Sequence, residues 1–142
     1  THALVTGAAV RFTLREENSA ERKASGMSDW TDWNERRVHL GKAIGNYAAV
    51  APDTVSGILA LNGASAKTGH LDAKTRELIA LAVAATTRCD GCITIHAEEA
   101  VKAGATREEL GEALSVAIAL NAGAALVYST RILDAFDAAK KG

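Results

Sequence analysis

The feature that most constrains this chain is its high alanine content. Alanine occurs 30 times in 142 residues, whereas there is one proline and only 4% of the residues are aromatic. Alanine has the highest intrinsic helix propensity, and β-branched and aromatic residues are the ones enriched in strands. The chain is therefore predicted to be all-α, and its length fits a single folded domain.

The charge balance narrows the classes of partner. Sixteen Lys and Arg residues face 17 Asp and Glu residues, which leaves a net charge of -1. A near-neutral chain lacks the basic surface that nucleic acids or acidic membranes attract. No secretory signal or membrane-spanning segment is expected, and two cysteines are too few for a secreted disulfide scaffold. We therefore expect a cytoplasmic protein that binds neither nucleic acid nor membrane.

A shift in composition near residue 26 divides the chain. Residues 1–26 combine a short apolar segment with a polar stretch, and we interpret them as a leader added to the natural chain or as an N-terminal extension that pairs with a neighbouring subunit. Met27 is the only methionine. Residues 27–142 are predicted to form the helical domain.

Apolar residues of that domain recur at steps of three and four, which is the period of an amphipathic helix. They predict helices over about residues 30–51, 54–67, 72–87, 89–104, 106–120 and 121–140. Asp72 is a predicted N-cap, and Thr106 with Glu109 forms a predicted capping box. The helix over 106–120 is apolar around most of its circumference, so we predict a homo-oligomeric interface there.

Both cysteines of the chain lie in one Cys-x-x-Cys motif, at Cys89 and Cys92. At a helix N-terminus these two residues are close enough to form a disulfide, and the unpaired N–H groups and helix dipole lower the pKa of the thiols. His96 follows Cys92 by four residues and therefore shares its helix face. An imidazole in that place can take the proton of the thiol and then pair with the thiolate.

Glu77 joins this group only if the chain turns back. In one continuous helix, Glu77 would lie about 18 Å from Cys89. If the chain reverses near Arg88, the two helices run antiparallel and Glu77 comes to lie opposite His96. A carboxylate there would orient the imidazole, which predicts a proton relay from Glu77 through His96 to Cys92, directly or through a water.

The pattern Glu-x11-Cys-x2-Cys-x3-His resembles the AhpD-like branch of the carboxymuconolactone decarboxylase superfamily, from about Asp53 to the C-terminus. The resemblance implies a helical bundle with the motif on a central antiparallel hairpin, assembled as a homotrimer or homohexamer. It implies an alkylhydroperoxidase or thiol-disulfide oxidoreductase in which Cys92 attacks the peroxide, Cys89 resolves, and His96 and Glu77 relay protons. It also implies no bound cofactor, an external dithiol reductant such as a dihydrolipoyl group, and a peroxiredoxin or lipoyl protein as redox partner.

Two points stay open at this stage. In thioredoxin-like motifs the outer cysteine is the reactive one, which favours Cys89, whereas the spacing to His96 favours Cys92. The founding alkylhydroperoxidase also carries a second histidine directly before the inner cysteine, where this chain has Gly91.

Three other interpretations use the same residues. One is a decarboxylase-like enzyme on the same fold, in a branch that lacks the cysteine pair. Another is a non-enzymatic oligomeric module with zinc held by Cys89, Cys92, His96 and a carboxylate, although structural zinc sites normally draw a second Cys or His pair from elsewhere in the chain. The third is a pair of buried, inert thiols.

Overall fold

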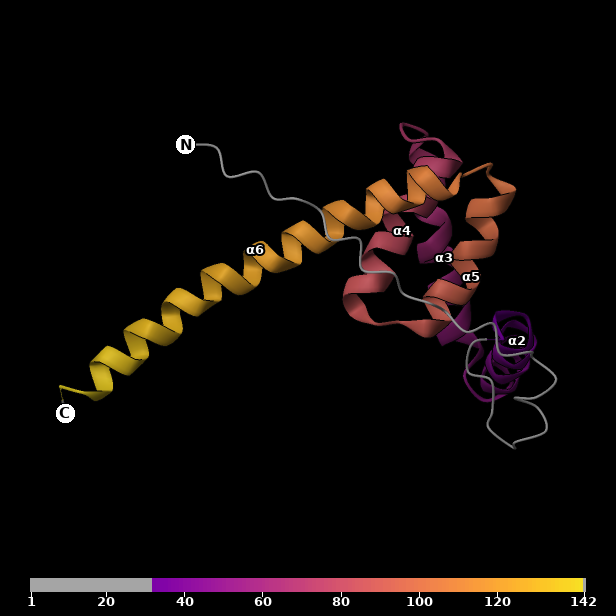
Figure 1. Cartoon of the computed structure of the whole chain (residues 1–142). Coiled ribbons are helices and arrows are strands. Elements are labelled where there is room, and N and C mark those ends of the chain that lie inside the picture. Colours follow the sequence, from indigo (N-terminus) through magenta and orange to yellow (C-terminus); the bar gives the residue numbers. More distant parts are fainter. Residues whose placement is uncertain (1–31, 142) are drawn as a thin grey trace, which may run out of the picture. The chain divides into compact units, whose positions relative to one another are not determined.

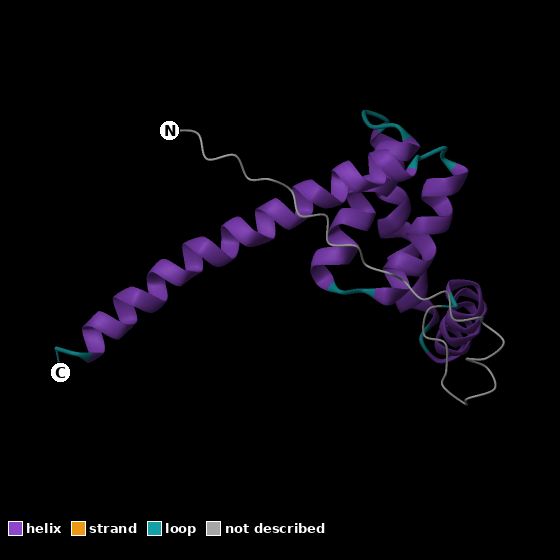
Figure 2. Ribbon diagram, in the orientation of Figure 1, coloured by secondary structure: helices purple, strands orange, loops and turns teal. Residues whose placement is uncertain are grey.

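The computed structural model describes residues 32–141, and all regular secondary structure in that part of the chain is helical, as predicted (Figures 1 and 2). The helices are α2 (Trp33–Val50), α3 (Pro52–Thr68), α4 (Ala73–Thr87), α5 (Asp90–Lys102) and α6 (Arg107–Ala139). The predicted leader or extension at 1–26 lies outside the described residues, so its boundary with the helical domain stays a prediction.

Local signals set the ends of the helices. The single proline, Pro52, begins α3, where a missing N–H costs nothing, and Gly69 ends it with a φ of 70°. Asp72 caps α4 as predicted, because its Oδ1 accepts a hydrogen bond of 2.7 Å from the backbone N–H of Thr75. The predicted capping box at the start of α6 is present as well.

Helices α4 and α5 form the hairpin at the centre of the domain (Figure 1). Arg88 ends α4 in the left-handed conformation (φ 55°, ψ 42°), and Cys89 then caps the start of α5. The chain therefore reverses at Arg88, as predicted. Leu81 and Ala84 are buried on α4, α6 packs against α4, and α2 packs against both α5 and α3.

The two helices predicted over 106–120 and 121–140 are one continuous helix, so that prediction was wrong. Asn121 was expected to begin a new helix, but its Nδ2 donates a hydrogen bond of 2.7 Å to the carbonyl oxygen of Ala117. The amide is thereby satisfied within α6 and has no helix end to cap. The small residues that follow continue the helix because no proline interrupts them.

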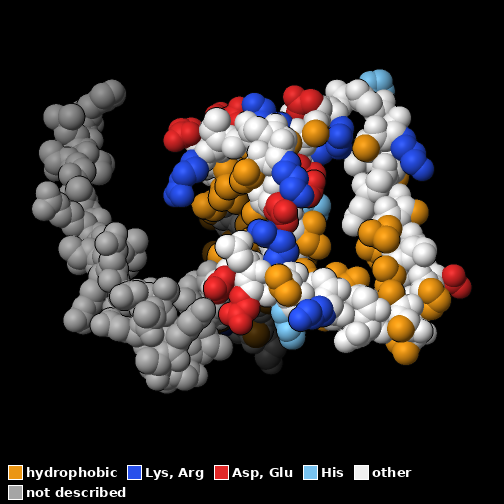
Figure 3. Space-filling model, turned by 90° about the vertical axis from the view of Figure 1, so that its right-hand side faces the viewer, with side chains coloured by type: hydrophobic (Ala, Val, Ile, Leu, Met, Phe, Trp, Pro, Cys, Tyr) orange, Lys and Arg blue, Asp and Glu red, His pale blue; other side chains and the backbone are white. Residues whose placement is uncertain are grey.

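The later part of α6 has no buried residue. Ala117 is the last buried position, and beyond it Leu126 and Leu133 are 70% and 65% exposed. Large hydrophobic side chains of α2 and α3 are also exposed (Figure 3). By length and composition alone, α6 could cross a membrane, although core helices of soluble proteins pass the same test. The expectation of no spanning segment did not take into account the uncharged stretch 113–130.

Candidate active site

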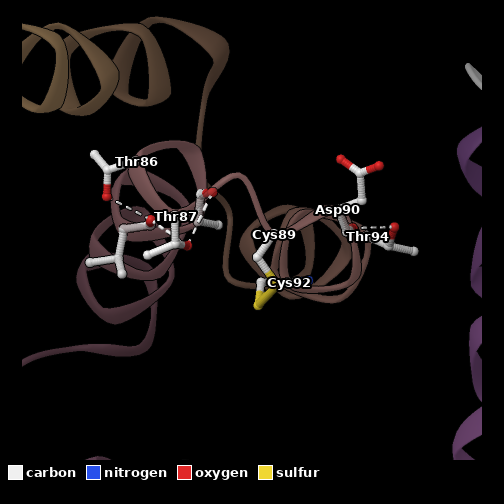
Figure 4. The surroundings of a disulfide bond; sticks show 8 residues. Thr86, Thr87, Cys89, Asp90, Cys92 and Thr94 are labelled. Carbon is white, nitrogen blue, oxygen red and sulfur yellow. Dashed lines mark hydrogen bonds between the residues drawn. A yellow bond between two sulfur atoms is a disulfide. The ribbon is translucent and has the colours of Figure 1, made fainter.

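The two cysteines form a disulfide at the start of α5. The Cα atoms of Cys89 and Cys92 are 5.3 Å apart, and both residues are half-buried. Cys89 is the N-cap, and its Sγ accepts a hydrogen bond of 3.2 Å from the backbone N–H of Cys92. Figure 4 shows the sulfur atoms on the side of the helix away from the carboxylate of Asp90. The pair therefore joins its two sulfurs where the helix offers unpaired N–H groups.

The N-cap geometry bears on which sulfur is the better thiolate. A helix N-terminus stabilises an anion that accepts from its first N–H groups, and Cys89 already accepts from one of them. This contact adds to the argument for Cys89 as the more stable thiolate. The spacing of Cys92 to His96 remains the argument for the inner cysteine.

Glu77 and His96 meet across the hairpin. Glu77 comes from α4 and His96 from α5, and the Oε2 to Nδ1 distance is 2.8 Å. The two side chains are only 20% and 29% exposed, respectively. The contact fixes the orientation of the ring and engages Nδ1, which leaves Nε2 free to exchange a proton elsewhere. The reversal at Arg88 thus brings together the two residues that the relay requires.

The ring of His96 is not joined to the sulfurs in the same way. Among the described residues, no hydrogen bond joins His96 to Cys89 or Cys92. In the disulfide neither sulfur carries a proton, so there is none to pass on in this state. A bridging water is the other route that the predicted relay allows, and such a bridge is nearly as favourable as a direct hydrogen bond.

A pocket of about 380 Å³ opens beside the Glu77–His96 pair. It is lined by Leu61, Asn62, Ser65 and Ala66 of α3, by Arg76, Glu77 and Ala80 of α4, and by His96 of α5. Arg76 is held at this end of α4 by a hydrogen bond to the carbonyl oxygen of Leu71. Neither cysteine lines the pocket, so it gives water and protons access to the carboxylate and the ring and does not lead to the disulfide.

Helix α2 supplies contacts that the sequence did not predict. The side chain of Leu40 lies against Gly91, and a Cβ added there would be 3.6 Å from Leu40 Cδ2. The place where the founding alkylhydroperoxidase carries its second histidine is thus faced by an apolar side chain. Arg36 pairs with Asp90 and Arg37 with Glu98, each at 2.8 Å. The only hint in the sequence was that Arg37 interrupts an apolar stripe.

The arrangement does not favour the zinc interpretation. Within residues 32–141, no group of three or more His, Cys, Asp or Glu side chains is placed to hold a metal ion. The two sulfurs are bonded to each other, and the ring of His96 is engaged by Glu77. The three residues proposed as ligands therefore do not converge on one point.

Comparison with known proteins places the chain in a family. The model of the carboxymuconolactone decarboxylase family matches residues 52–135, which is more than half of the chain. An uncharacterized protein of Haemophilus influenzae is 54% identical over 111 residues, covering 78% of this chain and 98% of that protein. An uncharacterized protein of Cupriavidus necator is 32% identical over 108 residues, covering 76% and 96%.

A solved structure agrees with these matches. The crystal structure of the apo form of a carboxymuconolactone decarboxylase family protein from Legionella pneumophila aligns with a TM-score of 0.59 at 36% identity. The alignment covers 74% of this chain and 94% of that one. On the evidence of both sequence and fold, the chain belongs to the carboxymuconolactone decarboxylase family.

Proposed function

We propose that this protein is a thiol peroxidase of the AhpD-like branch of its family, which reduces alkyl hydroperoxides through the Cys89–Cys92 pair. One observation carries the proposal: a disulfide at a helix N-terminus lies on the same hairpin as a half-buried carboxylate–imidazole pair. A decarboxylase has no use for two cysteines that close a disulfide, so the pair favours thiol chemistry over the decarboxylase alternative.

The cycle requires three balanced steps. The thiolate of Cys92 attacks the outer oxygen of the hydroperoxide, the O–O bond breaks, and the alkoxide leaves as an alcohol after taking a proton. Cys92 is then a sulfenic acid. The thiol of Cys89 attacks that sulfur, so that the S–S bond forms and water leaves. An external dithiol restores both thiols by thiol–disulfide exchange and is itself oxidised to a disulfide.

Glu77 and His96 act on protons in this scheme. With Nδ1 held by Glu77, the other ring nitrogen of His96 accepts the proton of the attacking thiol and returns it to the departing alkoxide. The pocket beside the pair allows that proton to exchange with solvent. Gly91 offers no second proton carrier, so His96 carries this role alone.

The reductant is expected to be a dithiol because two electrons and two protons are needed at one disulfide. A dihydrolipoyl group fits this need, either free or on a lipoyl protein, and a peroxiredoxin is a further candidate for a redox partner. The cycle uses no bound cofactor. Exchange proceeds by attack of a thiolate on one of the two half-buried sulfurs.

The proposal includes a homo-oligomer, a trimer or hexamer. The exposed apolar side chains of α6, such as Leu126, Leu133 and Phe136, are too many for the surface of a stable monomer. Their spacing along one helix fits a second helical surface of the same chain. The small residues 122–125 permit close approach of two helices.

Paired serine variants test the function. With an alkyl hydroperoxide and a dithiol donor, we expect Cys92→Ser to abolish turnover and also the first reaction with peroxide. We expect Cys89→Ser to abolish turnover but to consume one equivalent of peroxide and form a sulfenic acid at Cys92, detected by trapping and mass spectrometry. The reverse pattern would exchange the roles of the two cysteines. Full turnover by Cys92→Ser would refute the proposal.

A further inference from the structure

Helix α2 places a positive charge beside the first turn of α5. Nη1 of Arg36 lies 2.8 Å from Oδ2 of Asp90, and this contact is also a hydrogen bond. The guanidinium carbon of Arg36 lies 5.3 Å from the centre of the Trp33 ring, which packs the side chain on its own helix. Asp90 directly follows Cys89 and begins α5. The ion pair therefore joins α2 to the turn that carries the disulfide.

Asp90 and the two cysteines share the N-terminal turn of one helix. A carboxylate is favourable there because of the helix dipole, but a thiolate uses the same N–H groups and the same field. When the disulfide opens, the new thiolate and the carboxylate of Asp90 are like charges within one turn. Like charges this close repel each other, and a guanidinium paired with the carboxylate reduces the repulsion.

We infer that Arg36 is a positioning residue that sets the redox equilibrium of the Cys89–Cys92 pair by neutralising the carboxylate of Asp90. The inference deepens the proposed function and rests on it, because it assumes that the disulfide opens and closes in use. Arg36 does not touch the sulfurs. It acts through Asp90, and it makes reduction easier by lowering the free energy of the thiolate form.

Other charged or titratable residues on the turn and on the helices that pack around it include Arg88 in the turn, Arg37 on α2, His96 and Glu98 on α5, and Glu77 on α4. Arg37 is paired with Glu98, which also pairs with Lys102, and His96 is paired with Glu77. The Arg36–Asp90 pair is thus an ion pair at the residue directly after Cys89 that the peroxide chemistry does not already use.

The equilibrium to be measured is a balanced exchange. A small dithiol such as dithiothreitol breaks the Cys89–Cys92 bond, two protein thiols form, and the small dithiol closes its own disulfide. The chain has no other cysteine, so alkylation and mass spectrometry count the reduced protein directly. The measurement needs no peroxide and therefore does not depend on turnover.

A double-mutant cycle tests the inference. We expect Arg36→Gln to shift the exchange about threefold toward the disulfide, and Asp90→Asn about threefold toward the dithiol. Threefold is about 14 mV for a two-electron couple. The double variant should return close to the wild-type value. Raising the salt concentration should reduce each shift, because both residues are partly exposed to solvent.

Arg37→Gln is the matched control, since it breaks the neighbouring ion pair between the same two helices. It should leave the redox equilibrium unchanged. If Arg36 only docks α2 onto α5, then Arg36→Gln and Asp90→Asn would shift the equilibrium in the same direction, and the inference is wrong. Equal shifts for Arg36→Gln and Arg37→Gln would also overturn it. If the protein is not a peroxidase but the inference is right, no peroxide turnover is observed. The double-mutant cycle then still gives opposite shifts for Arg36→Gln and Asp90→Asn.

Discussion

The α4–α5 hairpin and the later part of α6 are both helical, but only the hairpin buries side chains within the chain. Within the hairpin, Leu81 and Ala84 are buried and Arg88 closes the turn. Glu77 of one helix lies within hydrogen-bond distance of His96 of the other. Beyond Ala117, α6 has no buried residue at all. The candidate active site is thus built within one pair of helices, whereas the large apolar side chains at the end of α6 are exposed.

The difference shows what helix propensity can and cannot do. A helix of 33 residues rich in alanine is long enough to form with little help from packing. The hairpin helices are 15 and 13 residues long, which is marginal for isolated helices, so their stability depends on packing against each other. Substitutions that disturb packing should therefore affect the two regions in different ways.

The largest expected effect is on assembly. Leu126→Glu combined with Leu133→Glu puts two charges on one apolar face of α6, where both side chains are exposed within the chain. If a second copy covers that face, burial of these charges is prohibitive and the oligomer should dissociate to monomers. Light scattering after gel filtration measures the mass, and circular dichroism checks that helices remain.

Arg131→Glu is the control for this variant, because Arg131 lies on the other side of the same helix. It should leave the mass unchanged. A wild-type protein that is monomeric at micromolar concentration would contradict the oligomer. A wild-type protein that instead partitions into phospholipid vesicles would assign the apolar face of α6 to a membrane.

The second effect is confined to the hairpin. Glu77→Gln keeps the shape of the side chain but removes the charge that orients His96 at 2.8 Å. We expect peroxide turnover to fall about 100-fold, which is the lower range for loss of a proton-transfer group. The disulfide should still form, as counted by thiol titration. Glu99→Gln, on an exposed carboxylate of α5, is the control, and a loss below about threefold for Glu77→Gln would remove Glu77 from the relay.

The third prediction compares a leucine from each region in the monomeric double variant of α6. Leu81 is 5% exposed and Leu120 is 69% exposed. Leu81→Ala should lower the free energy of unfolding by about 2–3 kcal/mol, through lost burial and the cavity left behind. Leu120→Ala should change it by less than about 0.5 kcal/mol. Urea unfolding followed by circular dichroism measures both, and equal losses would mean that α6 is packed within one chain after all.

The hairpin could be predicted because its information is local. Spacing alone placed His96 one turn after Cys92, and the side-chain caps at Asp72 and Thr106 are short-range patterns that need no tertiary contact. The position of Glu77 needed one further step, the reversal at Arg88. Since helices of known rise then run back along each other, the register followed from geometry.

What could not be predicted depends on contacts between distant segments. Nothing local in α2 says that Leu40 lies against Gly91 or that Arg36 reaches Asp90, which is 54 residues away in sequence. The continuity of α6 was missed because a local pattern was ambiguous. Asn121 looks like a helix start, but its amide can equally bond to the carbonyl oxygen of Ala117, and only the structure decides between the two.

The smallest expected effect lies where the hairpin meets the first turn of α6, at the ion pair of 2.6 Å between Lys74 of α4 and Glu109. The hydrogen bond from Lys74 holds the pKa of Glu109 below its ordinary value of 4.5, and the same bond raises the pKa of Lys74 above 10.5. A lowered carboxyl pKa stabilises the fold above the unfolded value, and this contribution is lost as the pH falls through the folded pKa. The raised pKa of Lys74 means that its contribution is lost at the alkaline end.

Glu109→Gln tests this link with little other change, because glutamine can keep the capping-box bond to the backbone N–H of Thr106. We expect the variant to be slightly less stable than wild type at neutral pH and equally stable once the pH is below the lowered pKa of Glu109, by urea unfolding at a series of pH values. Glu112→Gln, on the same helix and without an ion pair among the described residues, should follow the wild-type curve. Since both side chains of the pair are partly exposed, solvent screens their attraction, and the loss should be smaller than that of Leu81→Ala. A Glu109→Gln curve that runs parallel to wild type at every pH would show that the contact between α4 and α6 rests on apolar packing alone.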